Sequence, residues 1–257
     1  MYLIVGGDSL IGSALSDYWL EKKTLFRAST RKKEKVADDR PFIDLKNIDT
    51  FQKLDCYKSA VICAAITGIA ESEKNPDRVR KVNVTGIIEL AKWFNKHGIH
   101  FVFLSTSLVF DGKCPNQKPN APRNPFNEYG RQNAEVEIFV EKLPNACILR
   151  LTKVIHPGLE LLKRWKNNLS NGHSIYAFGD MTLSPVNLDE VVQKIDRLIK
   201  DRTRGIYQLS GENDISYYDF ALEFAKKNGY SPDLVKKDFW KRKLEFESPS
   251  HTSMVNV

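Results

Sequence analysis

Hydrophobic and polar positions follow two alternating periods along the first part of the chain. Short apolar runs that suit buried strands are followed by stretches with apolar residues three and four positions apart, the spacing of one helix face. The first such unit joins Tyr2–Val5, an amphipathic stretch from Leu10 to Trp19, and Leu25–Ala28. Strands and helices in this order predict a βαβ arrangement.

The same alternation continues to about residue 150. Further strands are predicted at Pro41–Asp44, Ala60–Ala64, His100–Ser105 and Ala146–Arg150. Helices are predicted over Asn75–His97, which Gly98 would end, and over Tyr129–Glu141, which would end before Pro144. The strands are almost continuously apolar, as strands covered on both faces are. We therefore predict an α/β fold with a doubly wound, mostly parallel sheet.

After Arg150 the rhythm loosens and suggests a smaller lobe. The predicted elements there are a helix at Leu159–Leu169, a strand at Ser174–Phe178, a helix at Leu188–Ile199, a strand at Ile206–Leu209 and a helix at Tyr217–Lys227. We expect residues 1–150, completed by about 184–203, to form the main domain. Residues 151–183 and 204–257 would form the small C-terminal lobe.

Composition narrows the function classes. The chain has 257 residues, 42% of them hydrophobic, and 39 Lys and Arg against 32 Asp and Glu, a net charge of +7. The basic residues are scattered among acids without an aromatic stripe, so we expect no nucleic-acid partner. The most apolar run, Ala60–Ala70, is far shorter than the roughly 18 residues of a membrane span, so we expect no membrane partner. The amino terminus has no basic leader, which predicts a cytoplasmic protein.

The cysteines and histidines give no metal-binding pattern. The four cysteines have no metal-type spacing, and His97 and His100 lie on either side of Gly98, a predicted helix end. We therefore predict no metal site.

A glycine-rich turn follows the first predicted strand. Gly6 and Gly12 hold the outer positions of a Gly-x-x-Gly-x-x-Gly pattern, and Ser9 stands at the middle one. Such a turn lets a pyrophosphate rest on the free N–H groups of the following helix, here from Leu10 and Ile11. Glycine spacing alone is weak evidence, because any tight strand-to-helix turn favours glycine. The pattern is typical of a Rossmann-type dinucleotide-binding fold.

The end of the second predicted strand indicates which dinucleotide would bind. Where a fold that prefers NAD has an acidic residue, this chain reads Ser29, Thr30, Arg31 and Lys32. Hydroxyl, guanidinium and ammonium groups suit the 2′-phosphate of NADP. The alternative is a solvated basic loop without a ligand. We predict NADP(H) as the cofactor.

Beyond these segments the chain resembles the extended short-chain dehydrogenase/reductases, most closely the dTDP-4-dehydrorhamnose reductase group. The resemblance runs from Tyr2 to about Val257. It rests on Phe42–Leu45, Cys63–Ala65, Asn83, Leu104–Gly112, Asn127–Arg131, Leu149–Arg150, Gly179–Pro185 and Gly205–Ser210. It implies a substrate-binding role for the small lobe and a nucleotide-sugar substrate. It also implies further cofactor contacts from Asp44, Leu45, Ala64, Ala65, Leu104 and Val154.

The resemblance also implies the catalytic groups. A Ser/Thr hydroxyl and a Tyr phenol bind the substrate carbonyl in this family, and here they would be Thr106 and Tyr129. A Lys one turn beyond the Tyr normally binds the cofactor ribose and lowers the phenol pKa, but this chain has Asn133 there. Asn133 can bind a ribose hydroxyl but supplies no charge. A protonated phenol can still donate its proton during ketone reduction, so a reductase is easier to reconcile with Asn133 than a dehydrogenase.

Two further departures from the family pattern bear on the reaction and the substrate. The sugar-nucleotide dehydratases follow the catalytic Thr with an acid pair, whereas Ser107 and Leu108 follow Thr106, so elimination chemistry is not expected. We expect Ser107 to contact substrate. Lys153 replaces an aromatic residue that the reductase group has near the active site. Lys153 could bring a cation to the substrate or could be an ordinary surface lysine.

Three hypotheses stay open. The first is an NADP-dependent reductase of a keto nucleotide sugar, in carbohydrate or surface polysaccharide biosynthesis. The second is a catalytically degenerate relative that binds NADP(H) or a nucleotide sugar as a regulatory subunit, which Asn133 favours. The third is a reductase or epimerase of another carbonyl substrate. The long predicted helices Asn75–His97 and Tyr129–Glu141 could pair two subunits as a homodimer.

Overall fold

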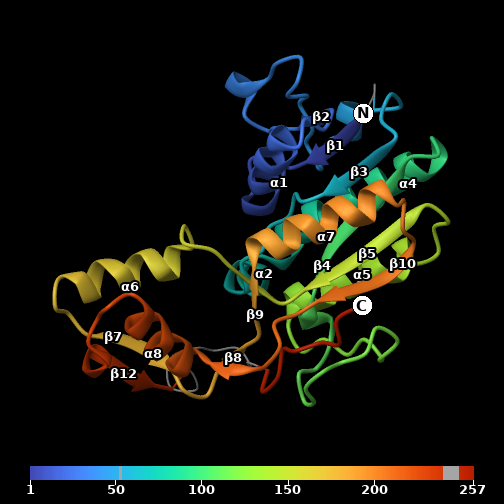
Figure 1. Ribbon diagram of the computed structural model, residues 1–257. Coiled ribbons are helices and arrows are strands. Elements are labelled where there is room, and N and C mark those ends of the chain that lie inside the picture. The colour runs from blue at the N-terminus through green and yellow to red at the C-terminus, as the bar shows by residue number, and fades with distance from the viewer. Residues whose placement is uncertain (52–53, 240–248) are drawn as a thin grey trace.

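A six-stranded parallel sheet forms the centre of the protein in a computed structural model, which describes residues 1–51, 54–239 and 249–257 (Figure 1). Its spatial order is β10-β5-β4-β3-β1-β2, and every neighbouring pair is parallel. The strands are β1 (Tyr2–Val5), β2 (Phe26–Ala28), β3 (Ser59–Ile62), β4 (His100–Thr106), β5 (Ala146–Leu151) and β10 (Gly205–Leu209). The doubly wound Rossmann-type fold predicted from the sequence is confirmed.

Helices cover both faces of this sheet. One face carries α1 (Leu10–Glu21) and α7 (Leu188–Lys200); the other carries α2 (Ile69–Lys74), α3 (Pro76–Arg80), the π-helical η3 (Lys81–Gly86), α4 (Ile87–Lys96) and α5 (Glu128–Val140). Alternate residues of each strand serve the two layers: in β1, Leu3 and Val5 pack toward α4, and Ile4 packs toward α1 and α7. The strands therefore read as continuously apolar because both of their faces are buried.

Short helices and one bridge complete this domain. The single-turn helices are η1 (Lys33–Lys35), η2 (Ile48–Phe51) and η4 (Ser107–Val109). The predicted strand at Pro41–Asp44 is wrong, because Phe42 makes only an isolated bridge to Thr30. Pro41 has no N–H to donate, and β2 ends at Ala28, so no ladder can extend there.

The long helix predicted at Asn75–His97 is a composite. It begins at Pro76, passes through the π-helical η3 and ends at Lys96, and the separate helix α2 precedes it. The π-helical segment holds Asn83, whose amide nitrogen donates to the Ile66 carbonyl (2.9 Å) and whose oxygen accepts from the Ile66 N–H (2.9 Å). Asn83 therefore fixes the segment that leaves β3.

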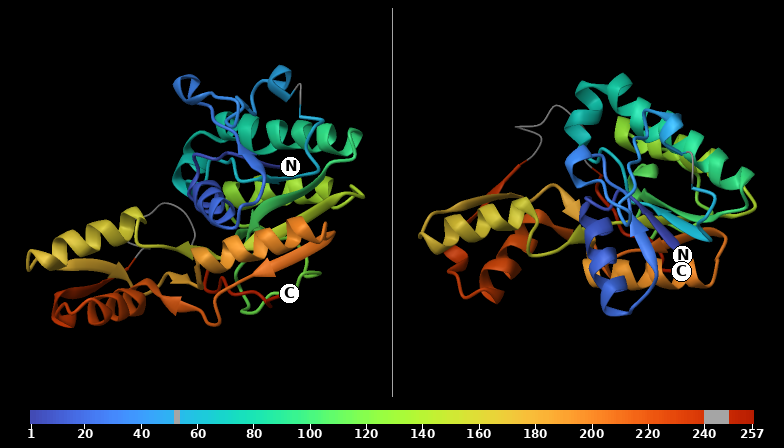
Figure 2. Two further views of the ribbon diagram at one scale, coloured as in Figure 1. Left: turned by 45° about the horizontal axis from the view of Figure 1, so that its top comes forward. Right: turned by 90° about the horizontal axis from the view of Figure 1, so that it is seen from above.

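The smaller lobe extends away from one end of the sheet (Figure 2). Its elements are β6 (Lys153–Ile155), α6 (Glu160–Ser170), β7 (Ile175–Phe178), β8 (Thr182–Leu183), β9 (Pro185–Asn187), β11 (Ile215–Ser216), α8 (Tyr217–Lys227), η5 (Pro232–Leu234) and β12 (Val235–Asp238). Trp165 of α6 packs against Phe220 and Phe224 of α8 in a hydrophobic core separate from those of the sheet.

The lobe boundaries differ from the expected ones after residue 203. Strand β10 pairs with β5 at the edge of the central sheet, because its apolar residues extend that sheet in register from Gly205 to Leu209. The terminal segment also returns to the main domain, where Met254 bridges Gln117 and the Val257 N–H donates to the Gln208 carbonyl. Helix α7 packs against α1, and the Trp19 indole donates to Asp196 (2.8 Å).

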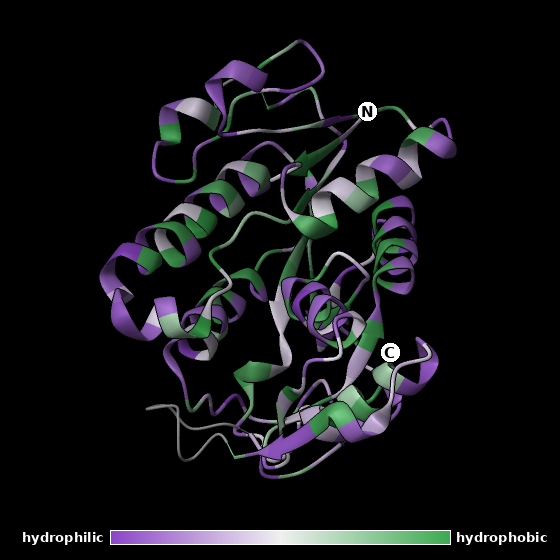
Figure 3. Ribbon diagram, turned by 90° about the vertical axis from the view of Figure 1, so that its left-hand side faces the viewer, coloured by the Kyte–Doolittle hydropathy of each residue, from purple (hydrophilic) through white to green (hydrophobic). Residues whose placement is uncertain are grey.

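Hydropathy follows this layering (Figure 3). The strands at the centre are mostly hydrophobic, and the helices turn hydrophilic residues outward. In the part of the chain that the structure describes, no helix has the length and apolar character needed to cross a membrane.

Candidate active site

Two adjoining cavities lie at the carboxyl edge of the sheet. Strand β2 lies on one side of β1, and β3 lies on the other side. The strand order reverses at β1, and α/β folds bind nucleotides at such a reversal. The first cavity has a volume of about 330 Å³ and the second about 580 Å³. Ser9 and Ala65 line both, so one ligand can extend from one cavity into the other.

The glycine turn after β1 places the backbone at the edge of these cavities. Gly6 has a φ of +92°, and a Cβ on it would lie 2.7 Å from the Ala64 nitrogen. A Cβ on Gly12 would lie 2.3 Å from the Gly6 carbonyl oxygen. Ser9 caps α1, since its hydroxyl oxygen accepts from the Gly12 N–H (3.1 Å). The first-turn N–H groups of α1 have no partner within the helix and suit a pyrophosphate.

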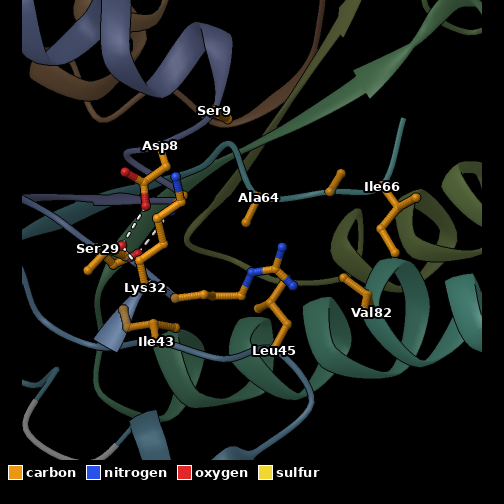
Figure 4. Close-up of a pocket in the computed structure, with 13 residues that line it drawn as sticks. Asp8, Ser9, Ser29, Lys32, Ile43, Leu45, Ala64, Ile66 and Val82 are labelled. Atoms are coloured by element: carbon orange, nitrogen blue, oxygen red, sulfur yellow. Dashed lines mark hydrogen bonds between the residues drawn. The ribbon is translucent and has the colours of Figure 1, made fainter. Parts of the chain in front are cut away.

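The first cavity gathers most of the residues expected to hold the adenosine side of the cofactor (Figure 4). Those that line it are Gly6, Ser9, Ser29, Thr30, Arg31, Lys32, Leu45, Ala64 and Ala65. Gly12 lies behind the turn, and neither it nor Asp44 lines the cavity; the Asp44 carboxylate accepts from the Lys46 N–H (3.0 Å). Ile43 of the segment Phe42–Leu45 also lines the cavity, whereas Asp8, Ile66 and Val82 were not expected there.

Asp8 is the most consequential of the missed residues. Its neighbours in the sequence marked the turn, but nothing in the sequence showed that its carboxylate would face the end of β2. In Figure 4, Asp8 and Ser29 lie on one side of the cavity and Ala64, Ile66 and Val82 on the other.

The second cavity brings the expected catalytic and substrate residues together. The predicted residues that line it are Ser9, Leu10, Ile11, Ala65, Leu104, Thr106, Ser107, Tyr129, Lys153 and Val154. Main-domain and lobe elements share its walls, because Met181, Thr182, Leu183 and Tyr217 also line it. The sequence analysis assigned no role to these four residues, although Met181, Thr182 and Leu183 lie within the segment Gly179–Pro185 that carries the resemblance.

Thr106 ends β4 with its hydroxyl oriented by the backbone. Its Oγ1 accepts from the Leu108 N–H at 3.2 Å, at the start of η4. A hydroxyl that accepts from the backbone keeps its own hydrogen available as a donor. Thr106 can therefore donate a hydrogen bond to a carbonyl oxygen in the cavity.

Tyr129 enters the same cavity from the first turn of α5. The helix begins there because the Asn127 side chain accepts from the Gly130 N–H (2.7 Å). Burial raises the pKa of the Tyr129 phenol to about 12, and hydrogen bonding by the Asn133 side chain offsets this only in part. The phenol is therefore protonated throughout the neutral range and can act as an acid.

Asn133 lies one turn further along α5 and outside the cavity wall. It is buried, and its amide nitrogen donates to the Tyr129 carbonyl oxygen (2.8 Å). One of the two amide hydrogens is thus used within the helix, and the side chain also hydrogen-bonds the Tyr129 phenol. Asn133 therefore positions Tyr129 through both contacts.

Lys153 is the only charged side chain among the described residues that line the second cavity. No carboxylate of the described chain pairs with it. Its side chain is accessible to solvent, yet the surrounding protein lowers the pKa of its ammonium group by desolvation. Lys153 is therefore both exposed and part of the wall of the second cavity.

A buried ion pair fixes helix α5 beneath the site. Arg150 of β5 donates through Nη2 to Glu137 of α5 (2.6 Å), and both side chains have 0% exposure. Glu137 also accepts from the Ser105 hydroxyl (2.5 Å) and from the Arg123 Nε (2.6 Å). The helix that carries Tyr129 is thereby joined to β4 and β5.

The described residues include no cluster of three or more His, Cys, Asp or Glu side chains arranged for a metal ion.

The protein has a parallel doubly wound sheet with a glycine turn at its switch point, and Thr106 and Tyr129 lie in one cavity. These features are typical of a dinucleotide-binding protein of the short-chain dehydrogenase/reductase class. Within that class the chain belongs to the family described as RmlD substrate binding domain, which it matches over residues 1–252. The resemblance found in the sequence is confirmed.

Individual relatives include enzymes and one subunit. The chain is 28% identical over 232 residues to dTDP-4-dehydrorhamnose reductase of Aggregatibacter actinomycetemcomitans, covering 86% of this chain and 76% of that protein. It is 26% identical over 190 residues to methionine adenosyltransferase 2 subunit beta of Xenopus tropicalis, covering 66% and 54%. The crystal structure of the Bacillus anthracis dTDP-4-dehydrorhamnose reductase in complex with NADP superposes with a TM-score of 0.89 at 20% identity, covering 100% of this chain and 90% of that one.

Proposed function

We propose that the protein is an NADP-dependent reductase of a keto nucleotide sugar in carbohydrate or surface polysaccharide biosynthesis. The observation that carries this proposal is the joint placement of Thr106 and Tyr129 in a cavity that adjoins the nucleotide turn. NADPH would supply the hydride. We further propose that the protein acts in the cytoplasm, and a homodimer remains a prediction.

The residues of this chain would perform three tasks. The α1 turn would bind the cofactor pyrophosphate, and Arg31 and Lys32 would bind its 2′-phosphate. Thr106 would donate a hydrogen bond to the substrate carbonyl oxygen. Tyr129 would donate its proton to that oxygen as the alkoxide forms, and its raised pKa keeps the phenol protonated at neutral pH. We also propose that Lys153 and Ser107 contact the substrate.

The direct test measures NADPH absorbance with a panel of 4-keto dTDP-, UDP- and GDP-sugars. We expect absorbance to fall with at least one of them. Tight NADPH binding without turnover on any member would instead support the second candidate, a binding subunit without catalysis. The specific observation in favour of that candidate is the neutral Asn133 at the position of the family lysine.

Asn133→Lys distinguishes a working reductase from a degenerate one. An ammonium group one turn from Tyr129 should stabilise the phenolate and lower the phenol pKa by about 1 to 3 units from its value of about 12. The alkaline limb of the reduction profile should then move to lower pH by that amount, while oxidation at a given pH becomes faster. Rates in both directions from about pH 6 to about pH 12 measure this shift, because the range must include the phenol pKa of both proteins.

The neutral variant Asn133→Gln is the control, because it changes size without adding charge. It should leave the alkaline limb in place. Equal shifts in the two variants would show that the packing of α5, and not a charge, sets the phenol pKa.

Arg31→Ala tests the cofactor preference. Arg31 lines the first cavity, and a hydrogen bond to a charged group contributes about 1.5 to 3 kcal/mol. NADPH affinity should therefore fall by about tenfold to a hundredfold, and NADH affinity should stay nearly constant. Fluorescence titration of both cofactors measures this. Lys33→Ala, which removes a neighbouring cation outside the cavity wall, should change neither affinity, and a loss of equal size there would point to a general charge effect.

A further inference from the structure

Asp8 places a carboxylate in the part of the first cavity where the cations of the nucleotide site gather. Its Oδ2 accepts from the Thr30 hydroxyl (2.5 Å), and its Oδ1 accepts from Arg40 Nη2 (2.8 Å). Lys35 Nζ lies 3.8 Å from the same Oδ1. Both carboxylate oxygens therefore have partners supplied by the segment that follows β2.

This carboxylate is ionised at neutral pH. The hydrogen bond from Thr30 has the largest effect and lowers its pKa; burial opposes this, and Arg40, Lys35 and Lys32 each lower the pKa further. A permanent negative charge consequently lies beside Arg31 and Lys32, which also line the cavity. The end of β2 is where Rossmann-type folds place the adenosine ribose and its 2′ substituent.

We propose that Asp8 determines cofactor specificity by accepting a hydrogen bond from a ribose 2′-hydroxyl and opposing a 2′-phosphate. A carboxylate can accept from a hydroxyl, but it repels a phosphate at the same position. Thr30 has a single hydroxyl proton and cannot donate to Asp8 and to a phosphate together. Asp8 would thus reduce the preference for NADPH that Arg31 and Lys32 create. This inference rests on the dinucleotide site of the proposed function.

Asp8→Asn is the variant that tests the inference, because it removes the charge and keeps the shape. The amide oxygen can still accept from Thr30, while Arg40 and Lys35 lose their anionic partner and become available to a phosphate. We expect the ratio of NADPH affinity to NADH affinity to rise by about tenfold or more. Isothermal titration of each cofactor at one fixed ionic strength, without substrate, measures this ratio directly.

Asp38→Asn is the matched control. Asp38 is an exposed acid of the same loop region and lies outside the cavity wall, so its removal changes net charge equally. It should leave the affinity ratio within about twofold. If Asp8→Asn does not fold, as circular dichroism would show, Asp8→Ser removes the same charge and should raise the ratio in the same way.

Results with Asp8→Asn, with Asp38→Asn or with the wild-type protein could each overturn the inference. An unchanged ratio in Asp8→Asn, or equal weakening of both cofactors, would show that Asp8 only stabilises the loop. An equal rise in Asp38→Asn would show a nonspecific charge effect. If the wild-type protein bound neither cofactor, the proposed function would fall and this inference with it, whereas an unchanged ratio with both cofactors bound overturns this inference alone.

Discussion

Tyr129→Phe is expected to slow NADPH-dependent reduction by about a hundredfold to ten-thousandfold, while NADPH affinity stays within about twofold. The phenol lies in the second cavity, and burial keeps its pKa near 12, so it holds a proton throughout neutral pH. Removal of that hydroxyl leaves the nascent alkoxide without its proton donor. Tyr129 does not line the first cavity, where the adenosine side of the cofactor is expected. Single-turnover absorbance on a substrate from the nucleotide-sugar panel, with a parallel NADPH titration, measures both quantities.

Tyr217→Phe is the comparison that identifies the acid. Tyr217 also lines the second cavity, and burial raises the pKa of its phenol to about 12 as well. It begins α8 in the smaller lobe, whereas Tyr129 lies in the first turn of α5 in the main domain. We expect a smaller loss from Tyr217→Phe than from Tyr129→Phe. The reverse order of losses would assign proton donation to Tyr217.

The sheet could be predicted from the sequence because its strands are covered on both faces. A nearly continuous apolar run such as Ala146–Arg150 predicts a strand buried on both faces, and the structure places that run in β5. Short edge elements carry less information. Phe42 bridges Thr30 only once, and the apolar residues around it predicted a full strand.

The candidate site was predictable where one short segment supplies the chemistry. The glycine turn and the loop after β2 each contribute several cavity residues from one short stretch of chain, so their sequence alone predicted that part of the cavity wall. The role of Asp8 was not predicted, because its partners Thr30 and Arg40 lie 22 and 32 positions away in the sequence. They approach Asp8 only because β1 pairs with β2. The lobe residue Tyr217 was missed because it also reaches the cavity only through the fold.

Arg150→Met should destabilise the protein by about 3 to 5 kcal/mol, because it leaves the buried Glu137 carboxylate without its main counter-charge. Arg150 also donates to the Pro119 carbonyl (2.9 Å) and to Gln208 (3.1 Å), so these acceptors lose a donor too. A loss of this size corresponds to a fall in Tm of about 6 to 20 °C. Thermal and urea unfolding followed by circular dichroism measure it.

Arg80→Met is the exposed counterpart on the same helix layer. Arg80 Nη2 contacts Glu135 of α5 at 2.5 Å, as closely as Arg150 contacts Glu137, but both side chains are 44% exposed. Water screens that pair, so its loss should cost no more than about 1 kcal/mol. The double variant Arg150→Met with Glu137→Met should recover part of the stability that Arg150→Met loses, because it removes the unpaired buried charge. Equal losses in Arg80→Met and Arg150→Met, or no recovery in the double variant, would show that desolvation of Glu137 is not what makes the buried pair necessary.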